Sequence, residues 1–240
     1  MTDPLETKPI VDPQEMSTLD EIIYRISHDL KTSVRALQEL PVWLEEDLKE
    51  EGITLSGETS VTLSMIHSHA RRLDEMITGL LSYSRVGRLQ QEVEIEPSTV
   101  FNAALQDLGK LENVKVVKNF QTFAVQMGER DLRQMFDILL SNAIKHHGPG
   151  DVKIEVTSCR YKKFWEFLVS DNGPGIADVD AERIFKPMVK LVSRDVDEGG
   201  GMGLATLQKI VSRYAGSIDI EARKRAGGTT FRVRLPVAVL

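Results

Sequence analysis

The chain has little cysteine and no long apolar run. Cys159 is its only thiol, which excludes an internal disulfide and a zinc site built from several cysteines. It falls in an alternating apolar segment, so we expect it to be a small core residue. No apolar stretch approaches the roughly 20 residues that span a bilayer, and the polar N-terminus lacks the apolar centre of a secretion signal. These absences predict a cytoplasmic protein that does not insert into a membrane.

An excess of positive charge is also missing. The 30 Lys and Arg residues are outnumbered by 36 Asp and Glu residues, which gives a formal net charge of −6. This balance argues against a protein that mainly binds nucleic acid. The 240 residues, 41% of them hydrophobic, suffice for one large or two modest domains with a real core.

The N-terminal third has the apolar spacing of helices. Residues 1–16 are polar, contain three prolines and are expected to form a flexible leader. From Ser17 the apolar residues recur at helical spacing, and Pro41 within that pattern predicts a kink or an irregular turn. A second helical pattern ends near Gly87. We therefore expect residues 17–88 to form a helical hairpin. Because one hairpin cannot bury both apolar faces, we expect a homodimer with a four-helix bundle.

The rest of the chain mixes two periodicities. Alternating apolar residues predict strands, and helical spacing predicts three further helices. The expected strands are 93–95, 114–116, 123–125, 152–156, 164–169, 218–220 and 231–235, and the expected helices are 98–111, 131–147 and 202–214. This order predicts an α+β two-layer sandwich over residues 92–238, with helices on one face of a mixed sheet.

The most informative segment, Gly199 to Leu204, has four glycines in five residues directly before a helical pattern. Glycines let the backbone approach a ligand closely, and a helix N-terminus aims free N–H groups at an anion. The upstream charged segment is expected to close over a nucleotide as a lid, with Lys190 and Arg194 offsetting triphosphate charge; an ordinary solvated loop is the alternative. The residues expected to cradle phosphates are Gly199, Gly201, Gly203 and Leu204.

Two further motifs fit the same ligand. Asn142 could hold Mg²⁺ through its amide oxygen, and Lys145, three residues later on the same helix face, could reach phosphates. Asp171 directly follows an apolar strand and could accept the adenine amino hydrogen, while Gly173 and Gly175 let the base approach. A polar helix face and a simple turn are the corresponding alternatives.

His28 is a candidate nucleophile near the N-terminus. Its imidazole titrates near neutral pH, so a ring nitrogen can attack phosphorus. Asp29 could orient the ring, and Thr32 lies one turn further on the same face, where its hydroxyl could position a water for hydrolysis. An ordinary exposed helix histidine is the alternative. His67 and His69 are expected to be surface residues.

Taken in order, these motifs resemble the transmitter core of two-component sensor histidine kinases over residues 18–238. The end of the second helix and the lid are most similar to the phytochrome-type branch. The resemblance is carried by Ser27-His28-Asp29-Leu30 as the H box, Asn142-Ala143-Ile144-Lys145 as the N box, Asp171-Asn172-Gly173-Pro174-Gly175 as the G1 box, Ile184-Phe185 as the start of the F box and Gly199 to Leu204 as the G2 box.

The resemblance implies a homodimeric ATP-dependent kinase with ATP and Mg²⁺ as cofactors and a Bergerat-type ATP-binding domain. His28 would be the phosphoacceptor, Asp29 its base partner and Thr32 the position linked to phosphatase activity. Asn142 would meet Mg²⁺, and Asp171 would contact adenine. The partner would be the receiver domain of a response regulator, and the sensor would lie on a separate protein or in a segment outside this chain.

Three positions depart from the family pattern. Ser33 stands where proline is usual, Ile138 where the N box commonly has a first asparagine, and Met188 where a second phenylalanine is usual. Ile138 has no ligating atom, which keeps open a second interpretation: a dimeric phosphotransfer or scaffold protein with a degenerate ATP site. A third is an ATPase or a protein-serine kinase with the same nucleotide fold.

Overall fold

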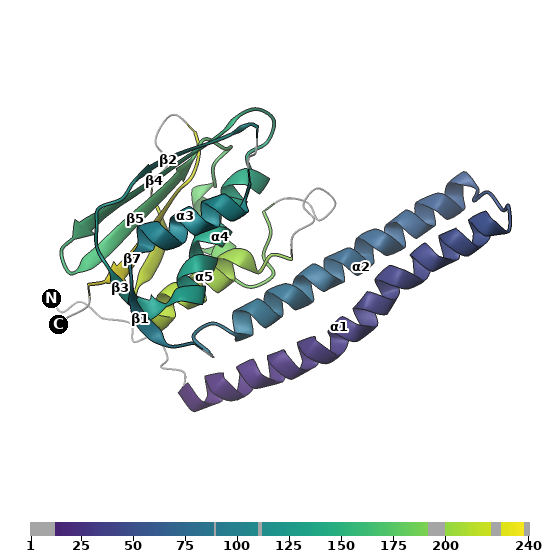
Figure 1. Cartoon of the computed structure of the whole chain (residues 1–240), viewed down its shortest axis with the longest axis horizontal. Helices are drawn as coiled ribbons and strands as arrows, with labels where there is room; N and C mark the ends of the chain where they lie inside the picture. Colours follow the sequence, from purple (N-terminus) through teal and green to yellow (C-terminus); the bar gives the residue numbers. More distant parts are fainter. Residues whose placement is uncertain (1–12, 89, 110–111, 192–199, 222–226, 238–240) are drawn as a thin grey trace. The chain divides into compact units, whose positions relative to one another are not determined.

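A computed structural model of the chain describes residues 13–88, 90–109, 112–191, 200–221 and 227–237 (Figure 1). The chain divides into two compact units, residues 1–85 and 86–240. No helix in the described part is long and apolar enough to cross a membrane.

The first unit is a helical hairpin. Helices α1 (Pro13–Glu50) and α2 (Gly57–Ser84) run antiparallel and side by side (Figure 1). Helix α1 begins at Pro13, inside the segment expected to be a leader. It also continues through Pro41 without an irregular turn. Proline removes a single hydrogen bond of the helix ladder, and Pro41 is buried in the hairpin.

The contact between the two helices uses residues seven positions apart, which is the coiled-coil repeat. The buried residues at this spacing are Ser27, Val34 and Pro41 on α1, and Leu63, Ala70, Ile77 and Ser84 on α2. Leu81 of α2 is also buried and packs with Val34 and Ile77. A second apolar set stays exposed: Ile22, Ile26, Leu30, Leu37, Leu40 and Leu44 on α1, and Val61, Met65, Ile66 and Leu73 on α2. The hairpin therefore buries one of its two apolar stripes.

The expectation for one histidine of α2 is wrong. His69 is exposed as expected, but His67 is half-buried, and its Nε2 is inaccessible to solvent and has no hydrogen-bond partner in the described ranges. Position 67 lies between Leu63 and Ala70 on the buried face of the helix. The polar ring of His67 is therefore partly covered, because its position in the heptad repeat faces the other helix.

The second unit is the expected α+β sandwich. Its five-stranded sheet has the order β2-β4-β5-β7-β6, in which only β2 and β4 are parallel. The strands are β2 (Val114–Asn119), β4 (Val152–Tyr161), β5 (Phe164–Asp171), β6 (Ser217–Ile220) and β7 (Thr230–Pro236). Strands β1 (Glu92–Ile95) and β3 (Val125–Gly128) form a separate antiparallel pair.

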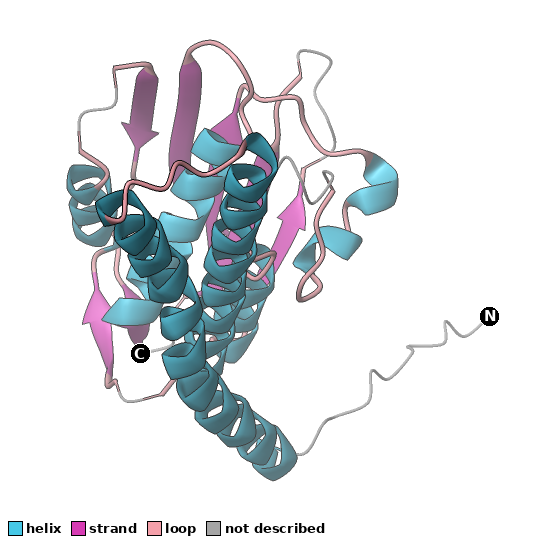
Figure 2. Ribbon diagram, turned by 90° about the vertical axis from the view of Figure 1, so that its right-hand side faces the viewer, coloured by secondary structure: helices cyan, strands magenta, loops and turns pink. Residues whose placement is uncertain are grey.

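Three helices cover one face of the five-stranded sheet (Figures 1 and 2). They are α3 (Pro97–Asp107), α4 (Glu129–Lys145) and α5 (Gly203–Arg213). Their apolar faces meet the inner side chains of the sheet around a cluster of aromatic rings, in which Phe136 packs edge-on against Phe101 and Phe167 at 5.2 and 5.9 Å. Burial of this interior is the main source of stability of the unit.

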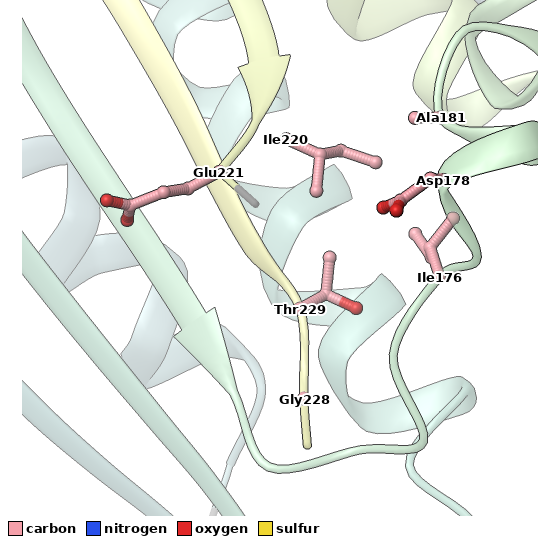
Figure 3. A pocket seen from close by; sticks show the side chains of 7 residues that line it. All are labelled: Ile176, Asp178, Ala181, Ile220, Glu221, Gly228 and Thr229. Atoms are coloured by element: carbon pink, nitrogen blue, oxygen red, sulfur yellow. The ribbon is translucent and has the colours of Figure 1, made fainter. Parts of the chain in front are cut away.

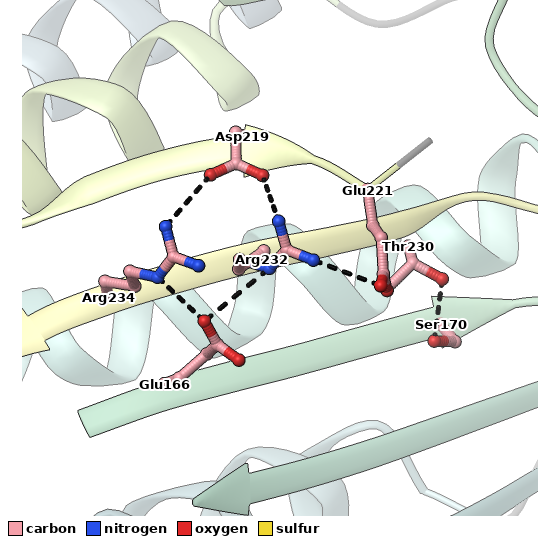
Figure 4. Close-up of polar contacts among 7 residues, drawn as sticks. All are labelled: Glu166, Ser170, Asp219, Glu221, Thr230, Arg232 and Arg234. Carbon is pink, nitrogen blue, oxygen red and sulfur yellow. Dashed lines mark hydrogen bonds and ion pairs between the residues drawn. The ribbon is translucent and has the colours of Figure 1, made fainter. Parts of the chain in front are cut away.

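The outer face of the sheet is polar. Arg232 of β7 bridges Asp219 and Glu221 at 3.2 and 3.1 Å, and Arg234 donates to Glu166 at 2.7 Å (Figure 4). Cys159 is half-buried and alternates with the buried Ser158, so it belongs to this outer side and not to the core as expected. The alternation of apolar residues predicted the strand correctly. Cysteine is usually buried, and this preference led to the wrong face of the sheet for Cys159.

Candidate functional site

The G1 turn is built around the Asp171 carboxylate. Asp171 ends β5, and its Oδ1 accepts hydrogen bonds from the backbone N–H of Gly173 at 2.8 Å and of Thr229 at 3.1 Å. Its Oδ2 accepts no hydrogen bond from the described part of the chain. The turn interpretation and the ligand interpretation are therefore compatible, because one oxygen closes the turn and the other is available.

A glycine pair that the sequence reasoning missed makes this arrangement possible. A Cβ on Gly228 would lie 2.0 Å from the Asp171 carbonyl oxygen, and Gly227 and Gly228 have φ values of +84° and +85°. Only glycine tolerates both the close approach and this backbone region. The signal in the sequence was Gly227-Gly228-Thr229 directly before the last strand.

The end of α4 packs against the G1 turn. A Cβ on Gly173 would lie 3.4 Å from the carbonyl oxygen of His146 and 3.6 Å from Cα of His147. Asn142, one turn earlier, is half-buried, and its Nδ2 is inaccessible to solvent and has no hydrogen-bond partner among the described residues. Nδ1 of His147, which the sequence reasoning did not select, is also covered and is unpaired within the part of the chain that the structure describes. Buried polar atoms are rarely left unsatisfied, so these two atoms indicate a polar ligand.

The N-terminus of α5 adjoins the same region. No side chain of the described residues caps it, so its first backbone N–H groups are available to an anion. A Cβ on Gly203 would lie 3.6 Å from Cγ2 of Ile138 on α4. The side chain at the departing N-box position thus fills the space beside the G2 helix with an apolar group.

The described residues on either side of the segment expected to form a lid are joined by one hydrogen bond. The backbone N–H of Met188 donates to the carbonyl oxygen of Gly201 at 2.9 Å, and both residues have positive φ values, +61° and +69°. Lys190 is half-buried shortly after Met188. Arg194 and Gly199 lie outside the described residues.

A small recess borders the G1 turn. It is lined by Ile176, Asp178, Ala181, Ile220, Glu221, Gly228 and Thr229 and has a volume of about 40 Å³ (Figure 3). That volume holds water-sized groups and is too small for a purine. An adenine at Oδ2 of Asp171 would therefore lie in a more open position than this recess.

The structure also describes the other residues of the N-box, G1 and G2 motifs. Lys145 is the exposed last residue of α4, Gly175 has a φ of +80°, and Leu204 packs against the core from the first turn of α5. Asn172 has a structural role: its Oδ1 accepts from the backbone N–H of Lys153 at 2.7 Å, which fastens the G1 turn to β4.

His28 belongs to the helical unit. Its side chain is 71% exposed, and Nδ1 lies 3.3 Å from Oδ1 of Asp29. When Nδ1 carries the proton and donates it to this carboxylate, the lone pair of Nε2 is free. Thr32 is exposed on the same helix.

Comparison with known proteins agrees with this architecture. Residues 127–239 match the family described as "Histidine kinase-, DNA gyrase B-, and HSP90-like ATPase". Phytochrome-like protein Cph1 of Synechocystis sp. is 28% identical over 222 residues, which cover 91% of this chain and 29% of that protein. Sensor histidine kinase TrcS of Mycobacterium tuberculosis is 31% identical over 228 residues, which cover 90% of this chain and 43% of that protein.

The fold is also found in a solved structure. Full-length ShkA in complex with AMPPNP superposes with a TM-score of 0.61 at 19% identity, over 96% of this chain and 47% of that one. The chain spans less than half the length of these relatives. With the two-helix unit and the ATPase-type sandwich, these matches support a sensor histidine kinase transmitter core.

Proposed function

We propose that the chain binds Mg-ATP in the sandwich unit, phosphorylates itself on His28 and passes the phosphoryl group to an aspartate of a response-regulator receiver domain. The observation that carries the proposal is that three groups without a hydrogen-bond partner among the described residues border one region: Oδ2 of Asp171, the side-chain amide of Asn142, whose oxygen is the ligating atom, and the N-terminus of α5. These groups match the adenine amino group, a magnesium ion and the phosphates, respectively.

The residues present fit a magnesium ion. The side chain of Asn142 makes no hydrogen bond within the described residues, so its amide oxygen is available, as expected for a cation that keeps water and phosphate oxygens as its other ligands. A bound Mg²⁺ would offset charge on the phosphate oxygens. Because Ile138 supplies no second amide, Asn142 is the protein ligand that we assign.

The transfer step assigns a role to each atom of the His28 pair. Nε2 attacks the γ-phosphorus of ATP, an N–P bond forms, the bond from phosphorus to the β,γ-bridging oxygen breaks, and ADP leaves. The Asp29 carboxylate accepts the hydrogen bond from the protonated Nδ1, with 3.3 Å between Nδ1 and Oδ1, and stabilises the positive charge that develops on the ring. Thr32 would position water in the reverse, hydrolytic reaction.

The exposed apolar stripe of the hairpin supports a homodimer. Six large apolar residues of α1 remain exposed at helical spacing, namely Ile22, Ile26, Leu30, Leu37, Leu40 and Leu44. An uncovered stripe of this length is unfavourable in water, and pairing with a second hairpin would bury it as a four-helix bundle.

Incubation with γ-labelled ATP and Mg²⁺ tests the proposal. We expect acid-labile label that disappears in His28→Gln and in Asn142→Ala, and that persists in the control His69→Gln, which changes an exposed histidine of α2. Acid-stable label or plain hydrolysis would instead identify a serine kinase or an ATPase.

A second candidate function rests on Ile138, whose apolar side chain fills the space beside Gly203. If the nucleotide site is degenerate, the dimer is a phosphotransfer or scaffold protein. The parent chain would then take no label from ATP and would accept it on His28 from a phosphorylated partner.

A further inference from the structure

The peptide that follows α2 is fastened to the sandwich unit. Val86 is 5% exposed and belongs to the core of that unit. The next N–H, that of Gly87, donates to Oδ2 of Asp131 at 2.8 Å. One residue further, the carbonyl oxygen of Arg88 accepts from Nη2 of Arg130 at 2.7 Å. Two neighbouring residues of the first turn of α4 thus hold consecutive residues of this peptide.

The carboxylate that holds Gly87 is unusual in its burial. Asp131 is 0% exposed, and a buried charge needs strong partners. The same Oδ2 also accepts from the Tyr214 hydroxyl at 2.8 Å, and that hydroxyl accepts from the N–H of Gly128 at 3.1 Å. The position of Asp131 in the first turn of α4 adds the favourable end of the helix dipole.

The fastening continues up to the first strand. A Cβ on Gly128 would lie 2.1 Å from Cδ of Gln90, so the Gln90 side chain lies directly on the backbone of β3. Gly87 itself is in the left-handed region, with φ at +73°. Residues 86–88 and 90 therefore follow the surface of the sandwich unit closely.

We propose that Asp131 is a positioning residue of the kinase reaction, which makes the start of the linker part of the nucleotide-binding unit. The last residue of α2 is Ser84 and the first buried residue of the sandwich unit is Val86, so Arg85 alone lies between them. The joint between the two units is thereby confined to the residues around Arg85. The catalytic part of this inference rests on the proposed function.

Amide hydrogen exchange of the full chain tests the fastening directly. In Asp131→Ala we expect the Gly87 amide to exchange at least roughly tenfold faster, because its bond to a charged acceptor is lost. Amides of β4 and β5 should exchange as in the parent, which separates a local release from general destabilisation. Asp137→Ala is the matched control, since Asp137 lies on the same helix but pairs with Arg133 at 2.8 Å.

The kinetic test is a split between kcat and KM. Released from Asp131, the linker gains freedom, so kcat for His28 phosphorylation should fall while KM for ATP stays unchanged. Asp131→Asn keeps one acceptor oxygen and should give intermediate values in both measurements, so the comparison remains available if the alanine variant does not fold.

Two results would overturn the inference. One is a Gly87 amide that exchanges equally in the parent and in both Asp131 variants. The other is a raised KM with unchanged kcat, which would assign Asp131 to the nucleotide site and not to the joint. If the parent takes no label from ATP, the proposed function fails, whereas the exchange comparison still decides whether the linker is fastened.

Discussion

Replacement of Asp171 by asparagine separates the two roles of its carboxylate. Oδ1 accepts two backbone N–H groups, from Gly173 at 2.8 Å and from Thr229 at 3.1 Å, while Oδ2 accepts none from the described residues. In Asp171→Asn the single oxygen should occupy the Oδ1 position, because both neighbours are donors. The amide NH₂ then replaces Oδ2, so the turn is kept while the ligand-facing atom changes from acceptor to donor.

The expected loss of affinity follows from this exchange. A hydrogen bond to a charged acceptor contributes about 1.5–3 kcal/mol, which corresponds to roughly a ten- to hundredfold loss in ATP affinity. In the variant the new amide NH₂ faces the adenine amino group, and because both are donors we expect a loss of affinity at the upper end of this range. Guanine carries a carbonyl oxygen where adenine carries its amino group, so the Asp171→Asn variant should lose most of the preference for ATP over GTP.

Calorimetric titration of the full chain with both nucleotides measures this effect. Asp171→Ala serves as the contrast, since it leaves two N–H groups without their acceptor and should lower the free energy of unfolding by about 2–4 kcal/mol. Asp178→Asn, an exposed carboxylate on the same loop, is the control and should change neither quantity. The reasoning is refuted if Asp171→Asn binds ATP as the parent does, or if it is destabilised as much as Asp171→Ala.

Three further predictions concern other parts of the chain. Gly201→Ala should abolish labelling by ATP, because φ is +69° and the new Cβ would lie 3.1 Å from the backbone carbon of Met188. Gly109→Ala is the control: its φ is +70°, and no described atom lies within 4 Å of the new Cβ. It therefore measures only the backbone strain, about 1 kcal/mol of stability. Burial above all raises the pKa of Tyr214 to about 12 from 10.0. The resulting stabilisation is complete below pH 10 and is lost as pH rises toward 12. Between pH 10 and 12, urea titrations should show that the free energy of unfolding falls by roughly 2 kcal/mol more in the parent than in Tyr214→Phe. An equal fall in both proteins would contradict the assignment. Leu37→Glu with Leu44→Glu should convert the proposed dimer to monomer in sedimentation equilibrium, because both side chains belong to the exposed stripe. An unchanged mass would contradict the assignment of this stripe as the interface.

The fold class was predictable because periodicity reports burial directly. Alternation in β4 and β5 and helical spacing in α4 each describe a single element with one buried face. Boundaries were less accurate, as at Pro13, where a polar segment with proline was expected to be a leader and begins a helix. Proline is tolerated in the first turn of a helix, so its presence did not exclude this start.

Pairwise contacts between distant residues were not predictable. Asp171 and Thr229 are 58 positions apart, and Asp131 and Tyr214 are 83 apart. Composition and spacing carry no signal for such a pair, because each partner is an ordinary residue in its own element. The error at His67 has the same origin: a half-polar helix offers two faces, and only the packing of the hairpin decides which one is covered. The roles assigned to His28 and the G2 glycines stay predictions.

Helix α4 connects the linker with the nucleotide site. Asp131 lies in its first turn and Asn142 near its end, about 16 Å apart at 1.5 Å per residue. Between them Phe136 and Leu139, both at most 1% exposed, are packed into the core, and close-packed interiors resist shear. The linker anchor and the proposed magnesium ligand must therefore move as one rigid body. Under the proposed function, a signal that reaches the linker acts on this unit as a whole and leaves the shape of its nucleotide site unchanged. Such a signal is expected to alter the rate of phosphoryl transfer to His28 and to leave nucleotide affinity unchanged.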